Sequence, residues 1–160
     1  MTRLMLSSIL CLSLCASSWA QSKGTKYALL IGVNKYDPTQ LHNLSFAEND
    51  VKALAEVLVK KSGFSPKNVY VMTTASGARN LRLAPTTKNI RRMLAGLSRI
   101  CDKEDTFAFA FSGHGAQFAK ERESYLCPMD ADLTNRKTLI HLKDEIYRRL
   151  ERDCKAATKL

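Results

Sequence analysis

Three short apolar runs, at residues 26–34, 68–74 and 106–111, alternate along the chain with longer segments of mixed polar and apolar residues. Each run is rich in aliphatic or aromatic side chains and is closed by polar residues or glycine. Continuous apolar runs of this length are typical of strands that are buried on both faces of a sheet. The pattern therefore predicts three core strands, the last of which stops abruptly at a Gly-His-Gly sequence.

Apolar residues recur at helical spacing in three of the longer segments. The first predicted helix has Ser45 as its cap, in a capping box, and stops at residues 62–63. The second has Thr86 or Thr87 as its cap, and the third spans residues 142–153. The order strand, helix, strand, helix, strand implies right-handed crossovers and a mainly parallel sheet that is covered on both faces.

Three other segments complete the predicted architecture. Gly77 lies in an expected loop, and residues 125–130 are expected to be extended, as a hairpin or an edge strand, because Pro128 disfavours a central strand. After residues 155–160 the chain stops, at the point where a fourth core strand is expected to begin. The predicted fold class is α/β: a three-layer α/β/α arrangement with a mainly parallel sheet that is incomplete at the C-terminus. The unpaired apolar edge of such a sheet invites self-association.

The first residues have the features of a targeting segment. Arg3 supplies a positive start, an apolar stretch follows, and residues 18–20 are suited to a signal peptidase. A membrane anchor is the alternative, but the apolar stretch is shorter than the roughly 20 residues that a spanning helix needs. We therefore expect a cleaved signal peptide at residues 1–20, a polar lead at 21–25 and one domain at 26–160, in a secreted or periplasmic protein.

Length and charge restrict the domain organisation and the partners. The 160 residues, of which 45% are hydrophobic, suffice for one core. The formal net charge is +10, or +9 once Arg3 is removed with the signal peptide. Nucleic-acid binding is one interpretation of this charge, but the basic residues are scattered over helix ends and loops, so a solvated surface is favoured and no nucleic-acid partner is expected. The glycines form no phosphate-binding pattern, and no cofactor is expected.

The cysteines of the predicted mature chain are Cys101, Cys127 and Cys154. They show no CxxC spacing, so the sequence predicts no metal site and no redox motif. One disulfide at most is expected to form in an oxidising compartment, and the sequence does not show which pair would close it.

His114 is the strongest candidate for a catalytic residue. It follows the third predicted strand, and functional sites of α/β proteins lie at such strand ends. The flanking glycines leave its imidazole free of neighbouring side chains and leave the Gly115 N–H able to approach a substrate carbonyl. The alternative is that the glycines only form a turn and His114 is a loop residue. His42 and His141 have no motif context, and we expect surface or capping roles for them.

Three ordered blocks, at residues 27–36, 44–50 and 111–115, resemble the caspase-like cysteine peptidases of the C14 type, and the bacterial metacaspase branch most closely. The resemblance implies a caspase-like fold and an endopeptidase with a Cys–His dyad, in which His114 is the catalytic histidine and Gly115 supplies the oxyanion N–H. It also assigns Asp50 and Ser112 to a pocket for a substrate Arg or Lys. Asp50 is equally well placed to complement the dipole of its helix. The family often has a cysteine at positions 45–47, and this chain has none.

The resemblance places the nucleophilic cysteine beyond Leu160, in a turn after the fourth core strand. Cys154 is at the end of a helix where the dipole disfavours a thiolate, Cys101 precedes the third strand, and Cys127 is expected to be a packed core residue. The chain alone is therefore expected to be inactive, and the expected partner of the whole domain is a peptide or protein substrate. The alternative is a pseudoenzyme that keeps the fold and acts as a protein-binding scaffold.

Overall fold

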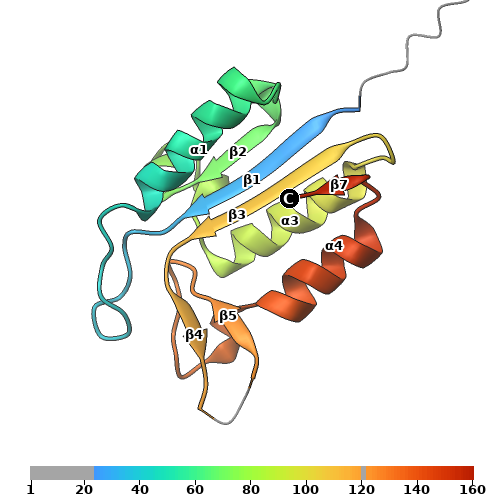
Figure 1. The fold of residues 1–160 in the computed structure, drawn as a ribbon. Coiled ribbons are helices and arrows are strands. Elements are labelled where there is room, and N and C mark those ends of the chain that lie inside the picture. The colour runs from blue at the N-terminus through green and yellow to red at the C-terminus, as the bar shows by residue number, and fades with distance from the viewer. Residues whose placement is uncertain (1–23, 120–121) are drawn as a thin grey trace, which may run out of the picture.

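The computed structural model describes residues 24–119 and 122–160, so the predicted signal peptide at 1–20 lies outside the described residues. The main sheet has four parallel strands in the order β2-β1-β3-β7 (Figure 1). Its strands are β1 (Lys26–Gly32), β2 (Val69–Met72), β3 (Thr106–Ser112) and β7 (Thr158–Lys159). The three predicted core strands and the mainly parallel sheet are therefore confirmed.

Strand β1 is the centre of the fold. It pairs with β3 along its whole length, from Lys26 opposite Thr106 to Gly32 opposite Ser112. Its middle residues alternate between two hydrophobic clusters: Leu29 packs in one and Leu30 in the other, and neither is accessible to solvent. A strand with apolar residues on both sides requires cover on both faces of the sheet.

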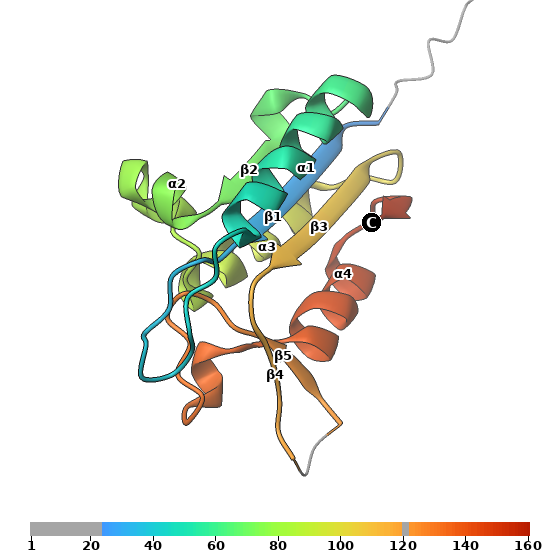
Figure 2. The same ribbon diagram turned by 60° about the vertical axis from the view of Figure 1, so that its left-hand side comes forward.

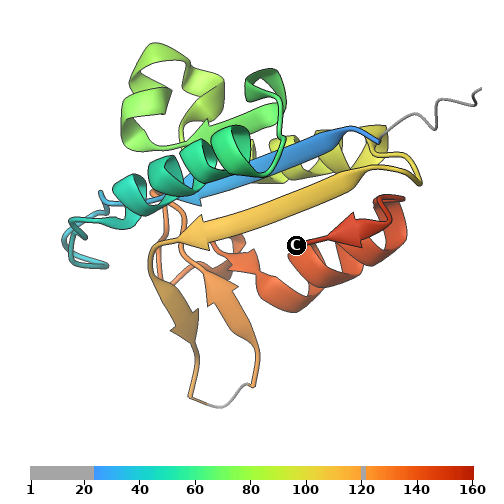
Figure 3. The same ribbon diagram turned by 45° about the horizontal axis from the view of Figure 1, so that its top comes forward.

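Helices supply this cover in two outer layers (Figure 3). Helix α1 (Ala47–Lys61) packs on one face, through Val51 and Leu58. Helices α3 (Thr87–Ile100) and α4 (Arg148–Asp153), the latter preceded by a π-helical turn η4 (Leu142–Tyr147), pack on the other face. The layers are therefore helix, sheet, helix, as the sequence predicted. Short 3₁₀ turns occur at η1 (Pro66–Asn68), η2 (Leu81–Leu83) and η3 (Arg136–Thr138).

A second, antiparallel sheet projects from the end of β3 (Figure 2). It has the order β4-β5-β6 and consists of β4 (Gly115–Gln117), β5 (Ser124–Leu126) and β6 (Ile140–His141). The extended segment that was predicted at residues 125–130 thus begins as a hairpin strand and ends at Leu126, before Pro128.

The predicted cap of the first helix is wrong. Phe46, not Ser45, occupies the N-cap position of α1, and it provides no side-chain hydrogen bond. The Asn34 side chain instead accepts the Glu48 N–H at 3.2 Å, so a residue from the preceding loop satisfies a donor of the first turn. In contrast, Thr86 caps α3 as predicted, by accepting the Asn89 N–H.

Two further expectations are corrected. The region of Gly77 is not a loop but helix α2 (Thr74–Arg79), which the Thr73 hydroxyl caps and which packs Gly77 directly against Ala84. The fourth core strand begins within residues 155–160, because β7 starts at Thr158.

Strand β7 covers only the beginning of the β3 edge. Its last rungs join the Leu160 N–H to the Phe107 carbonyl at 2.9 Å and the Phe109 N–H to the Leu160 carbonyl at 2.8 Å. Among the described residues no strand pairs with this edge beyond Phe109. Within residues 24–119 and 122–160, no helix is long and apolar enough to cross a membrane.

Candidate active site

The candidate site lies where β1 and β3 end side by side. Gly32 is opposite Ser112, and the Val33 N–H donates to the Ser112 carbonyl at 2.9 Å, which extends the pairing by one rung. The chain then leaves β1 into the loop at residues 33–46 and leaves β3 through Gly113 into His114. The carboxyl ends of parallel strands thus bring together two segments that are far apart in the sequence.

The imidazole of His114 is held by a backbone carbonyl from the β1 loop. Its Nε2 atom lies 2.8 Å from the carbonyl oxygen of His42, and the two imidazole rings meet edge to face with centroids 4.4 Å apart. A carbonyl only accepts, so this bond requires the proton on Nε2, and in the neutral ring the lone pair is then on Nδ1. His42 is exposed, as expected from the sequence, and its main-chain carbonyl additionally contacts the candidate catalytic residue.

Tyr36 is a site residue for which the sequence analysis predicted no role. Its hydroxyl accepts the His114 N–H at 2.9 Å and donates to the Cys127 carbonyl at 3.2 Å. Tyr36 is 7% exposed. Burial raises the pKa of this hydroxyl to about 12, although the bond from the His114 N–H opposes the rise. The hydroxyl is therefore a neutral hydrogen-bond bridge at neutral pH.

The structure brings the two predicted substrate-pocket residues together. The Ser112 hydroxyl donates to a carboxylate oxygen of Asp50 at 3.1 Å, across the gap between the end of β3 and the first turn of α1. Gly32 makes this approach possible, since a Cβ at this position would lie 2.7 Å from the Ala47 carbonyl and from Val51. Asp50 remains exposed, so its second oxygen is accessible to a cationic group.

The backbone N–H of Gly115 is not used in the β4–β5 ladder. Cys127 donates its N–H to the His114 carbonyl at 2.9 Å, which makes these two residues a hydrogen-bonded position of the β4–β5 ladder. Hydrogen-bonded and non-bonded pairs alternate along an antiparallel ladder, so Gly115, opposite Leu126, is at a non-bonded position. Its N–H is directed away from β5, and Gly115 is exposed.

None of the three described cysteines presents a reactive thiol. Cys127 is next to His114 in the ladder, but its side chain is buried in the core, and burial raises the pKa of the thiol to about 11. Cys101 and Cys154 end α3 and α4, and therefore lie near the beginning of β3 rather than its end. Burial, reinforced by the neighbouring Cys154, raises the pKa of the Cys101 thiol to about 12. Thiols of this kind are protonated and inert at neutral pH.

His141 has the capping role that the sequence predicted. Its side chain accepts the Asp144 N–H at 3.1 Å at the start of η4. The ring also lies within ion-pair distance of the Glu123 and Asp144 carboxylates, at 3.2 and 2.9 Å. His141 therefore has a structural role, away from the end of β3.

The sequence pattern of the metacaspase, peptidase C14 domain matches residues 26–158. The chain belongs to this family. Among relatives in Arabidopsis thaliana, metacaspase-4 is 38% identical over 97 residues, which cover 61% of this chain and 22% of that protein. Metacaspase-3 is 31% identical over 144 residues, which cover 86% of this chain and 38% of that protein. The chain therefore spans well under half the length of these metacaspases.

The fold of this metacaspase domain also matches a solved structure. The crystal structure of protein GSU0716 from Geobacter sulfurreducens aligns with a TM-score of 0.61 and 22% identity, over 84% of this chain and 47% of that chain. At this identity the match bears on the fold alone. The family and the fold that the three sequence blocks indicated are confirmed together.

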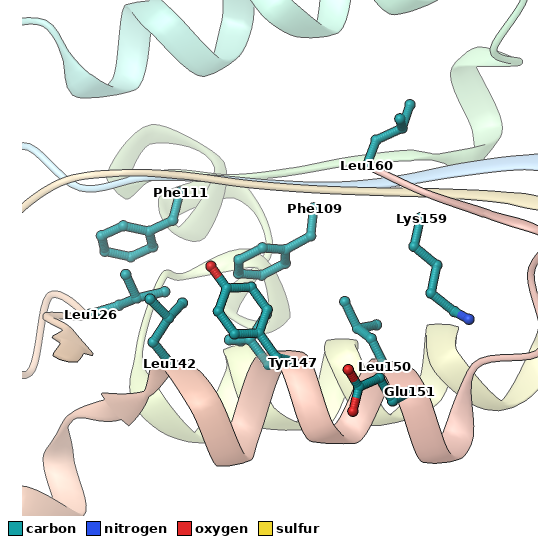
Figure 4. A pocket seen from close by; sticks show the side chains of 10 residues that line it. Phe109, Phe111, Leu126, Leu142, Tyr147, Leu150, Glu151, Lys159 and Leu160 are labelled. Carbon is teal, nitrogen blue, oxygen red and sulfur yellow. The ribbon is translucent and has the colours of Figure 1, made fainter. Parts of the chain in front are cut away.

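An apolar groove of about 520 Å³ lies beside the uncovered edge of β3 in this metacaspase domain (Figure 4). Phe109 and Phe111 project into it from β3, and Leu142 and Tyr147 face them from η4. Leu160, at the end of β7, lies at the other end of the groove from Leu126. The groove runs along the part of the β3 edge that β7 leaves uncovered.

Proposed function

We propose that this metacaspase domain provides the histidine half of a Cys–His endopeptidase site, with His114 as the general base and general acid. One observation carries the proposal: the bond of His114 Nε2 to the His42 carbonyl, at 2.8 Å, leaves Nδ1 as the basic nitrogen at the carboxyl end of β3. A histidine with one nitrogen held by an acceptor and the other open is suited to proton transfer.

The proposed reaction begins with a cysteine thiol. A thiol of ordinary pKa, about 8.5, is mostly protonated at neutral pH, and Nδ1 of His114 would take its proton as the thiolate attacks the substrate carbonyl. The same nitrogen would then protonate the leaving amine, and would activate the water that releases the acyl group. The N–H of Gly115, directed away from β5, would stabilise the oxyanion.

The nucleophile in this proposal comes from a segment outside residues 1–160. The three described thiols are buried, and burial raises the pKa of Cys101 to about 12 and of Cys127 to about 11. A continuation of strand β7 would bring such a segment to the site, because Lys159 already pairs with Phe107 of β3. Continued in the same register along the groove, a residue about four positions past Leu160 would pair with Ser112, next to His114.

Asp50 and Ser112 support a preference for Arg or Lys at the residue before the cleaved bond. The Ser112 hydroxyl occupies one side of the Asp50 carboxylate, at 3.1 Å, and orients it. The exposed carboxylate would pair with a guanidinium or ammonium group, and the pairing would be strongest for the planar guanidinium.

A catalytically inactive scaffold is the second candidate function. It is favoured by the burial of Cys101, Cys127 and Cys154, which leaves the described residues without an accessible thiol. In that case the site would bind a protein partner without cleaving it.

Cleavage of two matched peptides tests the proposal. The substrates differ only in the residue before the scissile bond, Arg in one and Glu in the other, and the enzyme is the protein that carries this chain. Cleavage of the Arg peptide alone, abolished by an alkylating reagent that blocks thiols, is the expected result. Cleavage that survives alkylation would exclude cysteine catalysis, and binding of the Arg peptide without turnover would favour the scaffold.

A further inference from the structure

We propose that Tyr36 is a positioning residue for His114: its hydroxyl, inserted between the first residues of the small sheet, fixes the backbone from which the catalytic imidazole projects. This inference rests on the proposed function and deepens it. It concerns a residue that does not contact the reacting atoms.

The hydroxyl takes the place of one hydrogen bond of the β4–β5 ladder. At a hydrogen-bonded position of an antiparallel ladder the two residues exchange both N–H to carbonyl bonds. Here Cys127 donates its N–H to the His114 carbonyl at 2.9 Å, but the His114 N–H does not bond directly to the Cys127 carbonyl. The His114 N–H donates to the Tyr36 hydroxyl at 2.9 Å, and this hydroxyl donates to the Cys127 carbonyl at 3.2 Å. The backbone of His114 is therefore attached both to β5 and to the loop that follows β1.

The main chain of Tyr36 is also bonded to the segment that carries the acceptor of the His114 ring. Its own N–H donates to the Asn43 side chain at 2.9 Å, and Asn43 directly follows His42, whose carbonyl lies 2.8 Å from Nε2 of His114. The rings of Tyr36 and His114 are in contact, with centroids 4.9 Å apart. The Tyr36 hydroxyl thus holds the main chain of His114, and the Tyr36 main chain helps to hold the segment whose carbonyl accepts from Nε2.

The surroundings hold the hydroxyl in this place. Tyr36 is 7% exposed, so the phenol has few alternative hydrogen-bond partners. At Gly113 a Cβ would lie 2.7 Å from this hydroxyl and 2.9 Å from the Phe111 ring. The glycine before His114 therefore makes room for the Tyr36 hydroxyl, in addition to freeing the histidine.

Tyr36→Phe is the direct test, because it keeps the ring and removes only the bridge. It leaves the His114 N–H and the Cys127 carbonyl unpaired, and we expect the imidazole to lose its fixed tautomer. In the peptidase assay kcat should fall about tenfold to a hundredfold, which is the rate loss that corresponds to the net free energy of two hydrogen bonds. KM should change by less than about twofold. Tyr70→Phe on β2 is the matched control, with kcat and KM as in the wild type.

Nitrogen NMR of the histidine side chains gives a readout that does not depend on activity. In the wild-type chain we expect His114 to be mainly the Nε2–H tautomer, and in Tyr36→Phe we expect a mixture of tautomers, with Tyr70→Phe unchanged. Should Tyr36→Phe not fold, Asn43→Ala, which loosens only the second attachment, is expected to shift the tautomers in the same direction.

The outcomes separate the two proposals. An unchanged His114 tautomer and unchanged kcat in a folded Tyr36→Phe would overturn the positioning role. Wild-type protein that has the expected tautomer but no peptidase activity would overturn the proposed function and leave the positioning of His114 by Tyr36 supported.

Discussion

Adding one methyl group at Gly113 should destabilise the domain, whereas the same change at Gly96 should stabilise it. Gly96 lies on the exposed face of α3, and a Cβ there would have no atom within 4 Å. Alanine in a helix interior is more favourable than glycine by about 0.5–1 kcal/mol, so Gly96→Ala should raise the free energy of unfolding by that amount.

At Gly113 the new Cβ would lie 2.7 Å from the Tyr36 hydroxyl and 2.9 and 3.0 Å from two carbons of the Phe111 ring, where ordinary contacts begin at 3.4 Å. The hydroxyl would have to withdraw, which breaks its bonds to the His114 N–H and the Cys127 carbonyl. A buried polar group that loses its partner destabilises by about 1–3 kcal/mol, so we expect a total loss of about 2–4 kcal/mol.

Urea denaturation followed by circular dichroism measures both variants against the wild type. The reduction of unfolded-state entropy is common to both substitutions, so the difference between them isolates the native-state clash. If Gly113→Ala were as stable as Gly96→Ala, the Tyr36 hydroxyl would not be confined as described, and the bridge between His114 and Cys127 would be refuted.

Three further predictions concern other parts of the domain. Arg91→Met should lower the free energy of unfolding by about 2–4 kcal/mol in urea denaturation, because Arg91 joins α3 to η4 by bonding both carboxylate oxygens of Glu145. A loss below about 0.5 kcal/mol would count against a stabilising role of this ion pair. The free energy of unfolding should fall as the pH rises from about 9 to 11. In this range the unfolded chain releases thiol protons that Cys101 and Cys127 retain in the folded state, where their pKa values are about 12 and 11. Urea midpoints that do not change with pH would contradict this prediction. Asp50→Asn should reduce kcat/KM for an Arg peptide at least tenfold with little effect on an uncharged peptide, and an equal loss on both would remove Asp50 from the pocket.

The parts of the fold that were predictable are those with a local pattern. The apolar run of β3 and the helical spacing of Val51, Leu58 and the apolar face of α3 follow from side-chain burial, which repeats along an element. The exception within helices is α2, where the cue was a Thr73 cap rather than a hydrophobic stripe. At α1 the Ser45 cap failed because Asn34, from another segment, satisfied the helix end.

The site was predictable only where one residue is distinctive by itself. His114 stands between two glycines, and Asp50 and Ser112 came from the family resemblance. The contacts that hold His114 join residues 72 and 78 positions apart, through the His42 carbonyl and the Tyr36 hydroxyl. A backbone carbonyl has no signature in the sequence, and a buried tyrosine is read as core, so both roles required the structure.

The central proposal is that His114 performs acid–base catalysis in a cysteine peptidase. The most direct measurement is kcat/KM for cleavage of an Arg-containing peptide by the protein that carries this chain, as wild type, as His114→Ala and as the control His141→Asn, which keeps a helix-capping side chain. We predict a loss of at least about a hundredfold in His114→Ala and activity within about twofold of wild type in His141→Asn. Undiminished cleavage by a folded His114→Ala variant would contradict the account.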